Sequence, residues 1–351
     1  MKKISIISSM LIIATIFMVS CGGGGTKDNA ATSDANGPLI GVTIYRYDDN
    51  FMSFYRRNIE SKIAGKANLI INDSQNNQAQ QNDQVDVMIN KDVKALAINL
   101  VDPQAAQTII DKAKAKNIPV VFFNKQPSAQ AMASYDKTWY VGTTPEESGD
   151  MQGKIVVDAW KADPTLDKNG DGVIQYVLIK GEPGHPDAEA RTSHVTMYIT
   201  NNGLKVEKLE AEQTAMWDTA KAKDIVDAWI QKHGDKIEFI FANNDAMALG
   251  ALQSIQALGY NTGDKAKYIP IVGVDAIPDM LNEIKKGTIL GSVLNDPVGQ
   301  SQALVDLTLN VAAGKDPVEG TTWTLDEVKA VRVPYVPITA DNVTIAEEAY
   351  K

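Results

Sequence analysis

The segment DKNGDGVIQ, residues 167–175, has oxygen-bearing side chains at its first, third, fifth and ninth positions and glycine at its sixth. This is the opening pattern of an EF-hand calcium loop. The twelfth position, where such a loop has a bidentate glutamate, is Leu178, and the run VIQYVLIKG is typical of a strand. A simple turn, for which NGDG would suffice, is the alternative. The alternation of Asp and Asn with Gln at the ninth position favours a metal site, although the loop itself lacks the last carboxylate.

Polar and aromatic side chains follow the predicted strands in both halves of the chain, where each strand ends. A single Asp or Asn in such a place is commonly a turn residue or a helix N-cap. Turns do not need Trp, Phe, Arg and His as well, so the series predicts a binding site. Carboxylates, amides and a guanidinium bond to hydroxyl groups, and an aromatic face stacks on the C–H side of a pyranose. The series points to a neutral polyol and consists of Asp48, Asp49, Phe51, Asn124, His185, Asp187, Arg191, Trp217, Asn243, Asn244, Asp275, Asn295 and Asp296.

The elements that must position these residues are short apolar runs alternating with amphipathic segments. The first half has LIGVTIY, NLIIND, KALAINL, IPVVFFN and WYVGT, with helices expected at 52–64 and 78–90. The alternation restarts after residue 148 with IQYVLIKG, KVEKLEAEQ, IEFIFANND, IPIVGVD and ILGSVLND, and with helices at 219–233 and 246–258. Such runs are typical of parallel strands buried on both faces. We therefore predict an α/β fold of two doubly wound parallel-sheet lobes, with a ligand in the cleft at the strand ends.

The composition is that of an acidic globular protein. The chain has 351 residues, a net charge of −10 and a pI of about 4.9. Nucleic-acid binding requires a basic face, so the charge argues against that class of partner.

The N-terminus predicts export and lipidation. Lys2 and Lys3 precede the apolar run ISIISSMLIIATIFMV, which is typical of a signal peptide over residues 1–20. MVSC resembles the lipobox of bacterial lipoproteins, in which the cysteine, here Cys21, carries the lipid. A plain secretory signal followed by a chance cysteine is the alternative. The stretch GGGGTKDNAATSDANG predicts a flexible tether over residues 21–38.

The chain resembles the periplasmic D-galactose/D-glucose-binding proteins, the sugar receptors of ABC importers and, in some bacteria, of chemotaxis. The resemblance runs from about Ile40 to the end, through IGVTIYRYDDNFMS, VKALAINLVDP, PVVFFNK, KGEPGHPDAEART, TAMWDTA, ANNDAMA, GVDA, VLNDP and VRVPYV. It implies a type I periplasmic binding protein fold with a three-strand hinge. It also implies that Phe51 and Trp217 sandwich the sugar ring. The polar contacts to the sugar oxygens that it implies are Asp49, Asn124, His185, Asp187, Arg191, Asn244, Asp275 and Asn295.

The resemblance also implies where the missing calcium ligand lies. In this family a nine-residue loop followed by a strand is completed by a distant glutamate. The implied ligands of a structural Ca²⁺ are Asp167, Asn169, Asp171, the carbonyl of Val173, Gln175 and bidentate Glu238.

Lobe boundaries and partners follow from the same resemblance. Crossings between lobes are expected near 141–144, 294–297 and 329–334. The N-terminal lobe then takes 39–142 plus 297–328, and the C-terminal lobe 145–294 plus 333–351. We expect a monomeric lipoprotein on the periplasmic side of the bacterial cell membrane, held there by its lipid anchor. It would close on D-galactose or D-glucose without catalysis and deliver the sugar to the membrane subunits of an ABC importer, and a chemoreceptor is a second expected partner.

Three alternatives remain at this point. The first is a receptor for another small sugar, such as a pentose. The second is a sugar-responsive transcription regulator, which would need a basic helix-turn-helix where this chain has a signal and a glycine tether. The third is an enzyme, with His185 and Asp187, or Asp48 and Asp49, as an acid–base pair.

Overall fold

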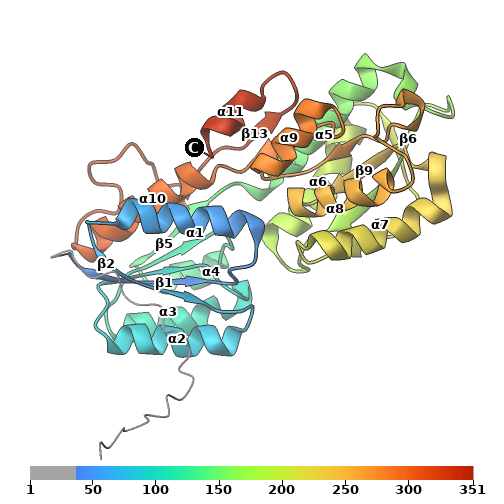
Figure 1. The fold of residues 1–351 in the computed structure, drawn as a ribbon. Helices are drawn as coiled ribbons and strands as arrows, with labels where there is room; N and C mark the ends of the chain where they lie inside the picture. Colours follow the sequence, from blue (N-terminus) through green and yellow to red (C-terminus); the bar gives the residue numbers. More distant parts are fainter. Residues whose placement is uncertain (1–36, 351) are drawn as a thin grey trace, which may run out of the picture. The chain divides into compact units, whose positions relative to one another are not determined.

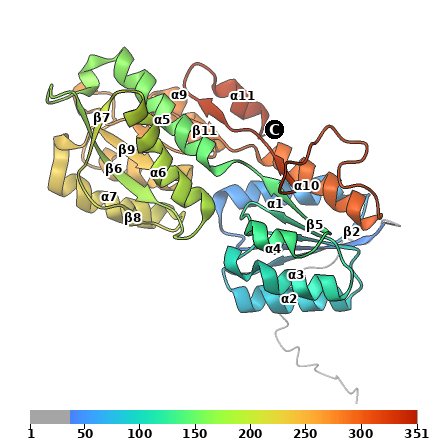
Figure 2. The same ribbon diagram turned by 180° about the vertical axis from the view of Figure 1, so that it is seen from behind.

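The computed structural model describes residues 37–350, all of which belong to one compact unit of the chain. The predicted signal peptide, Cys21 and almost all of the predicted tether lie outside the described residues. Within them, two parallel sheets are each covered by helices on both faces (Figures 1 and 2). We call the first sheet with its helices the N-terminal lobe and the second the C-terminal lobe. The predicted fold class, α/β with doubly wound sheets, is confirmed.

The sheet of the N-terminal lobe is entirely parallel, with the strand order β12-β5-β4-β3-β1-β2. Its first strands are near-continuous apolar runs, because helices cover both faces and leave no side of these strands to water. The strands are β1 (Leu39–Ile44), β2 (Asn68–Asp73), β3 (Ala95–Ile98), β4 (Val120–Phe123), β5 (Thr138–Gly142) and β12 (Ala330–Arg332).

Two apolar layers enclose this sheet. One layer joins α1 and α10 to the strands, and the other joins α2 and α3 to the opposite face. The helices of the lobe are α1 (Asn50–Ile63), α2 (Gln78–Asn90), α3 (Ala106–Ala115), α4 (Ala129–Ala133) and α10 (Pro297–Ala312), with a 3₁₀ turn at Pro103–Ala105.

The C-terminal lobe repeats this plan. Its parallel sheet has the order β10-β9-β6-β7, and β8 also pairs with β6. The run KVEKLEAEQ was predicted as one strand, but it forms two short strands that pair with different parts of β6. The strands are β6 (Val173–Lys180), β7 (Lys205–Lys208), β8 (Gln213–Thr214), β9 (Phe239–Ala242) and β10 (Ile271–Val272).

The second lobe also has an apolar layer on each face. One layer contains α5 and α6, and the other contains α7, α8 and α9. The helices are α5 (Pro145–Ala162), α6 (Pro186–Asn201), α7 (Thr219–His233), α8 (Asp245–Gln256), α9 (Pro278–Lys286) and α11 (Val343–Glu348), with 3₁₀ turns at Pro164–Leu166, Gly234–Lys236 and Lys265–Lys267.

The C-terminal part of the chain contributes strands to both lobes. Strand β12 pairs with β5 of the first sheet, although it falls in the segment predicted as a crossing. Strand β11 (Ser292–Leu294) then pairs antiparallel with β13 (Val336–Ile338). Isolated parallel bridges from Gly291 to Val272 and from Leu294 to Asp275 connect β11 to the region of β10.

Both lobes have a switch point in their strand order. The chain moves from β1 outward to β2 and then back to β3, and likewise from β6 to β7 and back to β9. Ligands of open α/β sheets bind beyond the carboxyl ends of the strands at such points. The loops after β1 and β6 contain the segments that the sequence singled out.

Candidate functional site

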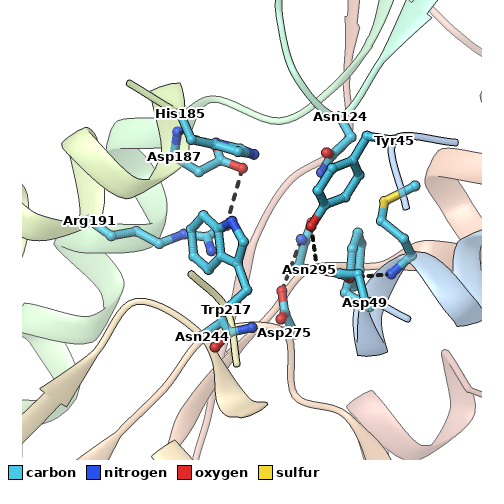
Figure 3. Close-up of a pocket in the computed structure, with 12 residues that line it drawn as sticks. Tyr45, Asp49, Asn124, His185, Asp187, Arg191, Trp217, Asn244, Asp275 and Asn295 are labelled. Atoms are coloured by element: carbon cyan, nitrogen blue, oxygen red, sulfur yellow. Dashed lines mark hydrogen bonds and ion pairs between the residues drawn. The ribbon is translucent and has the colours of Figure 1, made fainter. Parts of the chain in front are cut away.

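The structure brings all ten predicted binding residues together. They line one cavity with about 330 Å³ of empty space (Figure 3). Tyr45 and Met52 complete the lining and were not predicted.

Asp49 is positioned by the start of helix α1. It is the N-cap, and its Oδ1 accepts a hydrogen bond from the Met52 backbone N–H at 2.7 Å. The Tyr45 hydroxyl donates to Oδ2 at 2.7 Å. The cap therefore fixes the carboxylate at the cavity wall, and Phe51 follows it as a buried residue of the first helical turn.

Asn124 is held by an unusual backbone conformation at the end of β4. Its φ of 61° lies in the left-handed region, which Asn tolerates better than most residues. The Tyr140 hydroxyl donates to its carbonyl at 2.7 Å, and the Asn99 amide donates to its Oδ1 at 3.1 Å. Its Nδ2 group is thereby oriented as a donor.

His185 and Asp187 enter from the loop after β6. His185 caps helix α6, and its Nδ1 accepts a hydrogen bond from the Asp187 N–H at 3.1 Å. Burial, reinforced by the charges of Lys125 and Arg191, holds the pKa of His185 well below its usual value. The imidazole is therefore neutral, with its proton on Nε2. Burial also raises the pKa of Asp187, and Arg191 opposes the rise.

The guanidinium of Arg191 is almost fully buried and makes contacts in several directions. Nε donates to Ser148 Oγ at 3.0 Å, and Nη1 donates to the Asn243 carbonyl at 2.8 Å. Nη2 donates to the Tyr335 hydroxyl at 3.0 Å and lies 3.4 Å from Asp187 Oδ2. These contacts join α5, α6, the loop after β9 and the segment before β13.

Trp217 forms one wall of the cavity. Its φ of 64° and the φ of 54° at Met216 turn the chain sharply after β8. The indole lies against Gly181, where an added Cβ would be 2.2 Å from a ring carbon, so only glycine leaves room for it. The His185 ring packs edge-on against the indole, and the two ring centroids are 5.2 Å apart.

Asn244, Asp275 and Asn295 form the floor of the cavity, and they follow β9, β10 and β11 respectively. Asn244 caps α8 through a bond from the Met247 N–H to its Oδ1 at 3.0 Å, which leaves its Nδ2 group as a donor. The Asn295 amide donates to Asp275 Oδ1 at 3.2 Å. Burial raises the pKa of Asp275 well above its usual value, while the charge of Arg191 lowers it.

The arrangement suits hydrogen bonding to a polyol. The cavity combines carboxylate acceptors and amide and guanidinium donors with two aromatic side chains. Of the acid–base pairs considered from the sequence, Asp48 is not in the lining, and its side chain is 82% exposed and pairs with Arg46. The Nδ1 atom of His185 already accepts a backbone bond.

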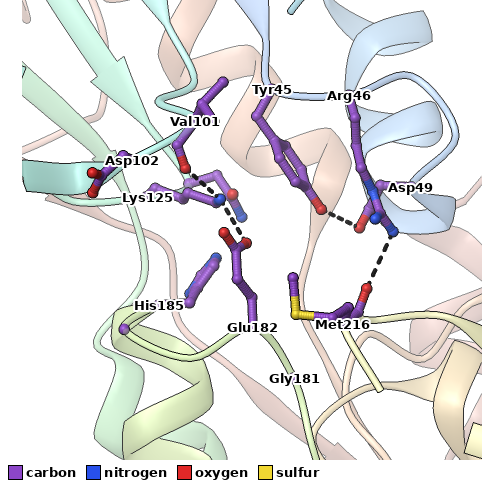
Figure 4. A network of polar contacts seen from close by, with 12 residues as sticks. Tyr45, Arg46, Asp49, Val101, Asp102, Lys125, Gly181, Glu182, His185 and Met216 are labelled. Atoms are coloured by element: carbon purple, nitrogen blue, oxygen red, sulfur yellow. Dashed lines mark hydrogen bonds and ion pairs between the residues drawn. The ribbon is translucent and has the colours of Figure 1, made fainter. Parts of the chain in front are cut away.

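An ion pair between buried Lys125 and partly buried Glu182, next to the cavity, links the two lobes (Figure 4). Lys125 follows Asn124, is fully buried, and donates to Glu182 Oε2 at 2.7 Å and to the Val101 carbonyl at 2.8 Å. Its Nζ also lies 4.1 Å from the centre of the Tyr45 ring. Sequence analysis did not include Lys125, although its place directly after a strand-end residue was a usable signal.

The predicted calcium loop is folded back on its own backbone. Asp167 Oδ1 accepts bonds from the Gly170 and Asp171 N–H groups at 2.8 and 3.2 Å. Glu238, on the segment leading into β9, points both carboxylate oxygens at this region. They accept from the N–H groups of Lys168 and Gln175 at 2.7 and 3.1 Å.

The donor set of this loop fits a hard cation, provided that two side-chain amides turn. Its candidate ligands are all oxygens, as Ca²⁺ prefers. Burial raises the pKa of Glu238, and the nearby charges of Asp167 and Asp171 raise it further, so a cation would relieve this repulsion. The Asn169 and Gln175 amide nitrogens now face Asp171 Oδ2 and would have to turn their oxygens inward. As the described chain is arranged, no three His, Cys, Asp or Glu side chains form a group that could hold a metal ion.

Comparison with known proteins identifies relatives along nearly the whole chain. Residues 40–316 match the model of the periplasmic binding protein domain. The chain is 51% identical to the D-galactose/methyl-galactoside binding periplasmic protein of Haemophilus influenzae, with 98% of both chains covered. It is 27% identical to the ribose import binding protein of Bacillus subtilis over 74% of this chain and 76% of that protein.

Solved structures agree on the fold. An ABC transporter solute-binding protein from Bacillus halodurans with bound myo-inositol superposes with a TM-score of 0.74 at 25% identity. The superposition covers 91% of this chain and all of that one. Among residues 37–350, the longest apolar helices fall short of what crossing a bilayer requires.

Proposed function

The chain belongs to the periplasmic binding protein family, and from this premise we propose that it is a receptor for D-galactose and D-glucose that delivers the sugar to an ABC importer. One observation carries the proposal. The ten residues that the family resemblance implies as sugar contacts lie far apart in the sequence and line a single cavity. The relative that is 51% identical binds D-galactose and methyl-galactoside by its name.

The cavity offers a sugar both apolar and polar surfaces. Phe51 and Trp217 would lie against the C–H faces of a pyranose ring, and the eight polar residues would bond to its oxygens. Most of these polar groups already have one partner within the protein, as Asn244, Asn124 and Asp49 do. Each therefore presents its remaining donor or acceptor in a fixed direction. Such a site rejects analogues that leave its buried polar groups unpaired.

Closure of the lobes would couple binding to transport. Lys125 and Glu182 belong to different lobes, and Arg46 Nη2 of the N-terminal lobe donates to the Met216 carbonyl of the other at 3.4 Å. We propose that these contacts form as the lobes close. The sugar binds the closed form better and shifts the population toward it, and the importer distinguishes that form. The protein changes no bond in the sugar under this proposal.

A receptor for another small sugar, such as a pentose, is the second candidate. The similarity to a ribose import binding protein favours this candidate. That similarity is weaker, however, because the identity is 27%, whereas it is 51% to the galactose-binding relative.

Calorimetric titration of the exported protein with galactose, glucose, ribose, xylose and arabinose tests the function. We expect micromolar or tighter binding of a hexose, which corresponds to about −8 kcal/mol or more, and weak or absent pentose binding. Tight pentose binding without hexose binding would establish the second candidate instead. Recovery of the sugar unchanged after incubation checks that there is no turnover.

Trp217→Ala should weaken hexose binding by at least about 30-fold, because truncating a central aromatic anchor commonly costs about 2 kcal/mol or more. Circular dichroism should show that the variant is folded. Trp323→Ala is the control, because Trp323 is partly exposed and bonds to Asp306, outside the cavity. Normal binding by the Trp217 variant would refute the stacking role.

Glu182→Gln should lower hexose affinity by roughly five- to thirtyfold through faster release. The substitution removes the charge that pairs with buried Lys125, and an uncompensated buried charge is costly. Stopped-flow fluorescence measures the release rate. Asp86→Asn is the control, since Asp86 pairs with Lys112 at 2.6 Å on an exposed surface. Equal release rates in both variants and wild type would exclude a role of the ion pair in closure.

We also propose that the 167–175 loop holds a structural Ca²⁺ with Glu238. The ion would tie the loop to the strand that follows Glu238. Glu238→Gln should abolish the stabilisation by calcium, which amounts to about 2.7 kcal/mol when the free ion is at 100 times its Kd. Melting temperatures in calcium and in chelator give the comparison, with exposed Asp224→Asn as the control. An equal decrease in melting temperature in calcium and in chelator would overturn the metal assignment.

The anchor is the last part of the proposal. We propose that residues 1–20 are a signal peptide, that Cys21 is lipidated and that residues 21–38 tether a monomeric receptor beside its importer. A chemoreceptor is a second proposed partner of the closed form. Cys21→Ser should release the protein from the membrane fraction. The variant should also no longer incorporate labelled fatty acid. Label that persists on the variant would refute the anchor.

A further inference from the structure

Asp245 is a fully buried carboxylate behind the cavity that has no part in the site described above. It is the first residue of α8 and directly follows Asn244, but it does not line the cavity. Buried carboxylates need partners. The side-chain partners of Asp245 are the backbone of Ile277, two residues after Asp275, and Ser292 of β11.

The carboxylate of Asp245 holds the backbone just after Asp275. Its Oδ2 accepts from the Ile277 N–H at 2.9 Å, and its Oδ1 accepts from the Ser292 hydroxyl at 2.6 Å. The Ser292 oxygen in turn accepts from the Ala276 N–H at 3.1 Å. Two successive backbone N–H groups are thus tied to one carboxylate, one directly and one through Ser292.

The backbone so held is strained. Asp275 has a φ of 120° and Ala276 a φ of 52°, and neither is glycine. Such conformations persist only where the surroundings enforce them. In this turn the backbone direction decides where the Asp275 side chain points.

The chain also makes room for this carboxylate. An added Cβ at Gly273 would lie 2.2 Å from Asp245 Oδ1, so only glycine fits there. The Asp245 N–H donates to the Val274 carbonyl at 2.8 Å. The segment from Gly273 to Ile277 is therefore folded around Asp245.

We propose that Asp245, acting through Ser292, is a positioning residue that aims the Asp275 carboxylate at the sugar; this inference rests on the proposed function. Asp245 itself does not touch the sugar. Asn244, which precedes Asp245, and Asp275, whose turn Asp245 holds, both line the cavity, as Figure 3 shows. The buried Asp245 carboxylate therefore orients part of the cavity floor. The carboxylates of Asp245 and Asp275 also interact electrostatically. Burial raises the pKa of Asp275, and the charge of Asp245 adds to the rise.

The chain contains a matched control for this role. Ser254 is also fully buried, and its hydroxyl also donates to a carboxylate, Asp227 Oδ1, at 2.6 Å. Ser292 and Ser254 therefore make the same kind of bond, but only Ser292 is connected to the Asp275 turn. Ser292→Ala and Ser254→Ala each remove one hydroxyl.

The experiment compares calorimetric galactose affinity and melting temperature for wild type, Ser292→Ala, Ser254→Ala, Asp245→Asn and Asp245→Ala. We expect Ser292→Ala to weaken binding about fivefold or more, while Ser254→Ala, with a similar melting temperature, binds like wild type. Asp245→Asn should retain more affinity than Asp245→Ala, because its amide oxygen can still accept from Ile277. If Asp245→Ala does not fold, the two serine variants carry the test.

A double-mutant cycle separates positioning from general loosening. With Asp275→Ala in place there is no carboxylate to aim, so adding Ser292→Ala should change affinity less than about twofold. An equal loss in both backgrounds, or equal losses from the two serine variants, would overturn the inference. If wild type itself binds no galactose, the proposed function has failed instead, and the two failures remain distinguishable.

Discussion

The buried guanidinium of Arg191 is the constraint around which the cavity is organised. A charge at this depth is tolerated only if its donors are satisfied, and they are met by Ser148, Asn243, Tyr335 and the nearby Asp187. These partners come from different elements of the C-terminal lobe. Satisfying one charge therefore fixes the relative placement of α5, α6 and the loop after β9.

The charge of Arg191 also acts on the titratable groups around it. Burial is the main cause of the lowered pKa of His185, and the charge of Arg191 lowers it further. The same charge offsets the rise in pKa that burial causes at Asp187 and Asp275. The same group reaches the crossing segments, because the Tyr335 hydroxyl that it contacts also accepts a bond from Thr143 Oγ1 at 2.9 Å. A movement of the chain between the lobes would therefore be transmitted to the cavity through Tyr335. The uncharged imidazole and the paired carboxylates suit a neutral ligand better than an ionic one.

Much of this architecture was predictable from local sequence. Helices α2 and α7 occur at the residues predicted, because their apolar spacing and the Asn77 and Asp218 caps are local signals. The split of one predicted strand into β7 and β8, and the pairing of β12 with β5, depend on partners distant in the sequence. Ten of the twelve lining residues were predicted, from strand ends and the family resemblance together, but Tyr45 and Met52 were missed. Their types fit the core as well as a cavity, and only the assembled walls distinguish the two.

The strand-end residues also show that a structural role and a binding role need not compete. Asp49, His185 and Asn244 are all helix N-caps, which is the ordinary explanation of such residues, and all three line the cavity. A cap uses one acceptor of the side chain on a backbone N–H and so fixes the direction of the atoms that remain. Because the helices after β1, β6 and β9 begin where parallel strands end, their caps converge on the same edge of each sheet. The fold thus supplies oriented polar groups at that edge, and the aromatic residues and Arg191 adapt this edge to a particular ligand.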